Sequence, residues 1–189
     1  MVEINRKTKE TDIKCKVDIQ SVGSVIDTGV GFFDHMLEAF AKHSGIFVDI
    51  SCNGDTQVDD HHSVEDCGIV LGEALKKEIF PIQNVERYGN ATVVMDEAAV
   101  ECALDLSNRP YLVYDFNLFG KVGDFDVELV EEFFYALTQK SGITCHLIFK
   151  RGKNKHHIIE ATFKAFAVAL RRALQSNDKL GIPSTKGIL

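Results

Sequence analysis

The chain has 189 residues with a formal net charge of −7, and 45% of its residues are hydrophobic. This composition is typical of one globular unit and excludes the strongly positive surface that nucleic-acid binding requires. No apolar run approaches the roughly 20 residues of a membrane span, and the first residues lack the apolar core of a signal peptide. We therefore expect a soluble, cytoplasmic protein that has no membrane or nucleic-acid partner.

The first half of the chain is expected to alternate strands and helices. Thr11–Gln20 has apolar residues at every second position, which predicts a strand with one buried face. Residues 32–43 carry apolar side chains at helical spacing, and Gly45 follows as a C-cap. Residues 46–52 alternate again, and a loop rich in Asp and Gly leads to a second helix that begins near His61.

The second half follows a similar plan. Strands are expected at Ala91–Met95, Val100–Leu106, Tyr111–Phe116 and Ile143–Phe149, and helices at Val130–Leu137 and Ile158–Leu174. Runs of strands followed by helices favour an α+β architecture whose sheets are antiparallel.

One series of motifs occurs twice. FFDHML, HSGI and HHxxE follow one another in residues 32–65, and EFFYAL, KSGI and HHxxE in residues 132–160. His35 and Glu132 take equivalent places in the two series. We therefore expect an internal duplication, with half-repeats 1–90 and 91–189 in one compact unit. Its helices would pack between two mainly antiparallel sheets.

The repeated HHxxE motif predicts a metal site. On a helix, His61 and Glu65 lie on one face, while His62 points about 100° away. Imidazole and carboxylate ligands without cysteine indicate manganese, iron or zinc, and six or more ligands for two ions favour octahedral manganese. The candidate ligands are His35, His61, His62, Glu65, Glu132, His156, His157 and Glu160. The five cysteines are instead expected to be buried, reduced thiols.

Cations and hydroxyls elsewhere in the chain suit an anionic phosphate ligand near the metal. They are Arg87, Arg109, Lys164, Ser184, Thr185 and Lys186. Glu10, Asp96 and Glu97 form an acidic set that could include a proton-transfer group, and spacing does not choose among them. A dinuclear metallohydrolase and a metal-storage or metal-sensing protein remain alternatives. The storage alternative needs none of the cations.

The segments FFDHML, DDHHSVEDCGI, NRPY, GKNKHHIIEATFKAFAVALRRAL and PSTKG resemble the imidazoleglycerol-phosphate dehydratase family, from about Arg6 to the C-terminus. The resemblance implies a duplicated fold like the second domain of ribosomal protein S5. It also implies dehydration of D-erythro-imidazole glycerol phosphate to imidazole acetol phosphate in histidine biosynthesis. Two manganese ions per active site would stabilise a substrate imidazolate. Family members assemble as 24-subunit shells with active sites between subunits.

The resemblance also assigns roles by position. The metal ligands of the family match His35, His61, His62, Glu65, His156, His157 and Glu160, and its substrate contacts match Glu10, Arg87, Arg109, Lys164, Ser184 and Lys186. Glu10 is the expected acid–base group, acting with His61, Glu65, His156 and Glu160 at the catalytic centre. Thr185 replaces a commoner serine and keeps a hydroxyl. Glu132 stands where many members have histidine, and is retained as a ligand.

Overall fold

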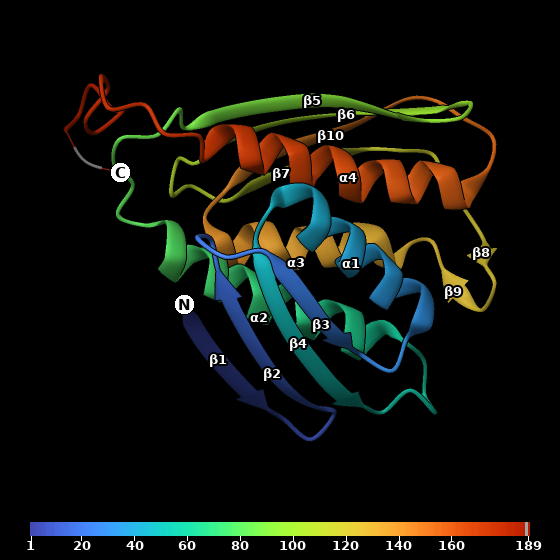
Figure 1. Ribbon diagram of the computed structural model, residues 1–189. Helices are drawn as coiled ribbons and strands as arrows, with labels where there is room; N and C mark the ends of the chain where they lie inside the picture. Colours follow the sequence, from blue (N-terminus) through green and yellow to red (C-terminus); the bar gives the residue numbers. More distant parts are fainter. Residues whose placement is uncertain (188) are drawn as a thin grey trace.

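The computed structural model describes residues 1–187 and 189. Two four-stranded sheets enclose a layer of helices, as the α+β prediction required (Figure 1). The first sheet contains β1 (Val2–Lys7), β2 (Thr11–Asp18), β3 (Gly23–Asp27) and β4 (Phe47–Gly54). The second contains β5 (Tyr88–Met95), β6 (Ala98–Asp105), β7 (Tyr111–Asp115) and β10 (Thr144–Arg151). The helices are α1 (Gly31–Ser44), α2 (His61–Ile79), α3 (Leu129–Ser141) and α4 (Lys155–Ala173).

The two sheets have matching strand orders, β1-β2-β4-β3 and β5-β6-β10-β7. Each is mixed rather than purely antiparallel, because β3 pairs parallel to β4 and β7 pairs parallel to β10. In each half a helix makes the crossover that a parallel pair needs. The sequence pattern did not predict β1, β3 or the small hairpin of β8 (Lys121–Val122) and β9 (Phe125–Asp126). These strands are short or largely exposed, so they lack a long apolar alternation.

The helices pack as two close pairs, α2 with α3 and α1 with α4. Glycine allows the first pair to approach: a Cβ atom on Gly68 would lie 2.7 Å from the carbonyl oxygen of Phe133. One on Gly72 would lie 2.6 Å from that of Leu137. From Gly68 to Gly72 on α2, the facing residue on α3 changes from Phe133 to Leu137. Both helices advance by four residues in the same sense, so α2 and α3 run in the same direction. Glu132 therefore lies on the turn of α3 that faces the start of α2.

The core and the boundaries follow the prediction in most respects. All five cysteines are buried with free thiols, as expected. Each predicted helix is present, with ends that differ by a few residues. Of the helices in residues 1–187, none combines the length and the apolar character needed to cross a membrane. The division into half-repeats at residues 90 and 91 stays a prediction; β5 begins at Tyr88, slightly before it.

Candidate active site

All four helices begin at the same end of the molecule, which we call the motif end (Figure 1). It carries the start of α2 with His61 and the start of α4 with His156. The Asp59 side chain accepts a hydrogen bond from the backbone N–H of His61 at 2.9 Å, and Asn154 accepts one from His156 at 3.0 Å. Asn154 is the N-cap residue of α4, whereas the N-cap residue of α2, Asp60, makes no side-chain cap bond. In both halves, a side chain two residues before the first histidine of the motif therefore bonds the backbone N–H of that histidine.

The second HHxxE motif forms the tightest cluster of possible ligands. Glu160 Oε2 lies 3.2 Å from His156 Nε2 and 3.5 Å from His35 Nε2, so side chains of α4 and α1 converge. Lys164 Nζ donates to Glu160 Oε1 at 2.6 Å. The Glu160 side chain is 8% exposed. Burial alone would raise its pKa, but Lys164 and the two imidazoles outweigh burial, so the pKa is lowered and the carboxylate is favoured.

The first HHxxE motif is more open. His61 Nε2 lies 3.7 Å from Glu65 Oε2, and both side chains are 41% exposed. Within residues 1–187 and 189, His35, His156 and Glu160 are the one group whose ligand atoms all lie within 4.8 Å of one another. Half-buried Glu132, the counterpart of His35, lies on α3 beside the start of α2. The chain therefore brings the second ligand set together more closely than the first.

The second histidine of each motif is held by a carboxylate from a loop. Both oxygens of Asp55 approach His62 Nδ1, at 3.0 and 3.1 Å, and Glu10 lies 3.8 Å from His62 Nε2. Glu97 Oε2 lies 2.8 Å from His157 Nδ1. These hydrogen bonds raise the pKa of both imidazoles. Glu97 also accepts hydrogen bonds from the backbone N–H groups of residues 154 and 153. Together with the bond from His157, these bonds lower the pKa of Glu97 to about 2.

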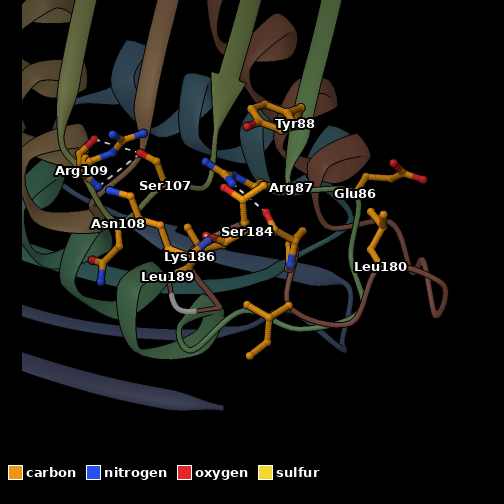
Figure 2. Close-up of a pocket in the computed structure, with 13 residues that line it drawn as sticks. Glu86, Arg87, Tyr88, Ser107, Asn108, Arg109, Leu180, Ser184, Lys186 and Leu189 are labelled. Carbon is orange, nitrogen blue, oxygen red and sulfur yellow. Dashed lines mark hydrogen bonds between the residues drawn. The ribbon is translucent and has the colours of Figure 1, made fainter.

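The predicted phosphate contacts gather at the opposite end of the molecule, in a cavity of about 890 Å³ (Figure 2). Its lining includes Arg87, Arg109, Ser184, Thr185 and Lys186. The Arg109 side chain is 73% exposed and faces the solvent side. The cavity therefore offers cations and hydroxyls to an anion. Glu10, by contrast, lies at the motif end beside His62, and Lys164 lies midway along α4, where it bonds Glu160; neither lines this cavity.

Arg87 has a second task in this cavity. Its Nε and Nη2 donate to Asp105 at 2.7 and 3.0 Å, and its Nη1 donates to the carbonyl of Pro183 at 2.7 Å. The bonds to Asp105 raise the arginine pKa, and the bond to Pro183 ties the C-terminal segment to the body of the protein. Sequence reasoning missed Asp105, because it ends a strand without any motif. It also missed Asp55.

The motif end and the cavity are far apart within one chain. The backbone N–H of Arg87 donates to the carbonyl of Ala173, the last residue of α4, whereas His156 lies in the first turn of that helix. The helix has 19 residues, and at 1.5 Å per residue it spans about 28 Å. A small substrate cannot touch both ends of one chain.

The fold and these side chains are typical of an enzyme that acts on a small anionic substrate. The model of the imidazoleglycerol-phosphate dehydratase family matches residues 28–170. The curated enzyme of that name from Aliarcobacter butzleri is 73% identical over 190 residues, which cover both chains completely. The chain belongs to this family, whose members are dehydratases of histidine biosynthesis.

Two solved structures of family members share the fold. The crystal structure from Staphylococcus aureus has a TM-score of 0.83 and 41% identity, and covers 94% of this chain and 100% of its own. The structure from Pyrococcus furiosus has a TM-score of 0.85 and 39% identity, and covers 98% of this chain and 100% of its own. The α+β prediction and the predicted family are thus confirmed, and neither the hydrolase nor the storage alternative receives support.

Proposed function

We propose that the chain dehydrates D-erythro-imidazole glycerol phosphate to imidazole acetol phosphate at a dinuclear manganese site formed between subunits. The observation that carries this proposal is the meeting of His35, His156 and Glu160 at the motif end, in a chain of the dehydratase family. The cationic cavity at the other end supplies the matching place for a phosphate.

The donor set fits manganese. Histidine nitrogens and carboxylate oxygens come together without a cysteine, and all five thiols are buried in the core. Such mixed nitrogen and oxygen ligands suit an octahedral divalent ion better than a thiolate-seeking one. The residues that would hold the two ions are His35, His61, His62, Glu65, Glu132, His156, His157 and Glu160. Two divalent cations there would supply the positive charge that favours the deprotonated form of the substrate imidazole.

The separation of the two ends supports self-association. Since about 26 Å of α4 lies between His156 and the end of the helix at Ala173, a substrate bound to metal at one chain's motif end needs the cavity of another chain for its phosphate. A closed assembly satisfies this need for every copy. We therefore retain the 24-subunit shell, with active sites between subunits, as the proposed assembly.

The chain's own side chains divide the remaining work. Arg109, Ser184, Thr185 and Lys186 would hold the phosphate and so keep the reacting carbon in place, with Arg87 fixing the segment that carries three of them. Glu10 is 54% exposed and faces the Nε2 side of His62, where it is free to move a proton between the substrate carbon and the leaving hydroxyl. Glu97 is a poorer candidate for this role, because both of its oxygens are already bonded.

The direct test is an assay of the metal-stripped protein with imidazole glycerol phosphate, with and without manganese, in which product is identified by mass spectrometry. We expect product only with manganese. Turnover without any divalent metal, or none with it, would overturn the proposal.

A complementation test addresses the shared site. Glu160→Gln disables the motif end and Lys186→Ala the cavity, and each variant alone is expected to be inactive. After the two are dissociated, mixed and reassembled, some sites would combine an intact motif end with an intact cavity and regain activity. Failure of reassembled mixtures to regain any activity would contradict a site formed between subunits.

A further inference from the structure

We propose that Asp55 and Glu97 are positioning residues that fix the rings of His62 and His157, so that each ring offers its Nε2 lone pair to a metal ion. The inference rests on the proposed manganese site and adds two residues to it. Neither carboxylate belongs to an HHxxE motif, and each comes from a loop beside it.

The contacts of the two carboxylates are directed at one ring atom. Asp55 approaches His62 Nδ1 with both oxygens, and Glu97 approaches His157 Nδ1 with Oε2. A carboxylate accepts hydrogen bonds, so the proton of the neutral ring lies on Nδ1 and the lone pair on Nε2. Metal-bound histidines are commonly held in this way, which fixes both the tautomer and the ring orientation.

The first histidine of each motif is arranged differently. His61 and His156 face the glutamate of their own helix through Nε2, and the ion pairs of the described residues include none at their Nδ1 atoms. The outer carboxylates therefore act on the second histidine of each pair. In both motifs the glutamate pairs with the first histidine, so a loop carboxylate is the partner that holds the second ring.

The two halves reach this arrangement by different routes. Asp55 directly follows β4, and the residue that directly follows the matching strand β10 is Gly152, which has no side chain. In the second half the bond comes instead from Glu97, which directly precedes β6. The residue at the matching place before β2 is Glu10. In the first half, Asp55 bonds His62 Nδ1, so Glu10 is not needed for this bond. Glu10 instead faces the Nε2 side of the His62 ring.

The different contacts of the two carboxylates make a sharp test possible. In Asp55→Asn, the amide can turn its oxygen toward His62 Nδ1, since either oxygen of Asp55 already lies within reach. In Glu97→Gln, the single oxygen is claimed by the backbone N–H groups of Lys153 and Asn154, which Glu97 Oε1 accepts at 3.0 and 2.7 Å. The amide NH₂ then faces His157 Nδ1 and favours the opposite tautomer, with the proton on Nε2.

The experiment measures the dissociation constant of manganese for the assembled full-length protein, from the electron paramagnetic resonance signal of free Mn²⁺. Variants are Asp55→Ala, Asp55→Asn, Glu97→Ala and Glu97→Gln. Asp59→Asn is the matched control, because Asp59 lies in the same loop as Asp55 but bonds a backbone N–H rather than a ring. Thermal denaturation of the metal-free variants shows that each is folded.

We expect Asp55→Ala, Glu97→Ala and Glu97→Gln to weaken manganese binding by about 10- to 100-fold, and Asp55→Asn and Asp59→Asn by less than about tenfold. Parental affinity in both alanine variants, or an equal loss in Asp55→Asn and Glu97→Gln, would overturn the inference. If the unmodified protein takes up no manganese, the proposed function itself fails, which is a separate result.

Discussion

The two halves of the molecule share a fold but differ at their HHxxE motifs. In the second half, Glu160 is 8% exposed and contacts His35, His156 and Lys164. In the first half, Glu65 is 41% exposed and faces only His61 among the described ion pairs. Both motifs lie at the start of a helix, and in each a side chain two residues earlier bonds the backbone N–H of the first histidine. The repeat has thus kept the position of the ligands while changing their surroundings.

The charge around the two motifs differs as well. The second set combines Glu160 with a lysine one turn later and with His35 from the neighbouring helix. At the place of Lys164, α2 has Ile69, and at the place of His35, α3 has Glu132. The first set therefore carries two carboxylates and no cation where the second carries one of each. We expect the two ion sites to differ in affinity, with the first set attracting a divalent cation more strongly.

The largest effect is expected from Glu160→Gln compared with Glu65→Gln. Both changes should lower manganese affinity and turnover by at least about 100-fold, because each removes a proposed ligand rather than its support. Only Glu160→Gln should also destabilise the metal-free protein, by about 1–3 kcal/mol, since it leaves Lys164 without its charged partner in a partly buried place. Metal analysis and thermal denaturation measure the two effects. Equal destabilisation by both variants would contradict the claim that only the second half holds its glutamate with a partly buried lysine.

Replacing Glu132, the proposed ligand that stands where many family members have histidine, should have the next largest effect. Glu132→His replaces a hard oxygen ligand with imidazole and removes one negative charge from the first set. We expect the preference for manganese over zinc to fall by about tenfold, because imidazole suits zinc and a carboxylate suits manganese. Competition titrations of the two metals measure this preference, with Glu131→His on the adjacent, exposed position as the control. An unchanged preference in Glu132→His would show that Glu132 is not a ligand.

Lys164→Ile, which copies Ile69 of the first half, should have opposite effects on metal and substrate. Removing the cation that bonds Glu160 is expected to tighten manganese binding by about tenfold or less, as the carboxylate loses a competitor. If Lys164 also contacts the substrate, KM should rise. Metal titration measures the effect on manganese affinity, and steady-state kinetics measures the effect on KM. Weaker manganese binding in this variant would contradict the idea that Lys164 competes with the ion for Glu160.

A smaller, pH-dependent effect is expected at His157 and Glu97 in the metal-free protein. The raised pKa of His157 stabilises the fold below its ordinary value of 6.5, and this stability is lost as pH rises through the raised value. The lowered pKa of Glu97 stabilises the fold above its ordinary value of 4.5, and this is lost as pH falls toward about 2. Glu97→Ala should therefore lower the melting temperature most between pH 4.5 and 6.5, and a pH-independent difference would contradict the pairing.

The repeat made much of this molecule predictable. Matching motifs predicted two similar halves with helices between sheets, and the helical spacing of HHxxE predicted the pairing of His156 with Glu160. What could not be predicted depends on contacts between distant segments. Asp55 and Asp105 carry no motif, and their partners, His62 and Arg87, are reached only after the loops fold back. The sequence also grouped the phosphate residues with the metal ligands, whereas one chain holds them at opposite ends of α4.

The most direct test of the account is a crystal structure of the assembled protein with manganese, with anomalous scattering measured at the manganese edge. We predict two anomalous peaks in each active site at the motif end, one of them bound by His35, His156 and Glu160, and the cavity of a second subunit opposite them. Peaks elsewhere, or a motif end without any bound ion in a protein that is active, would contradict it.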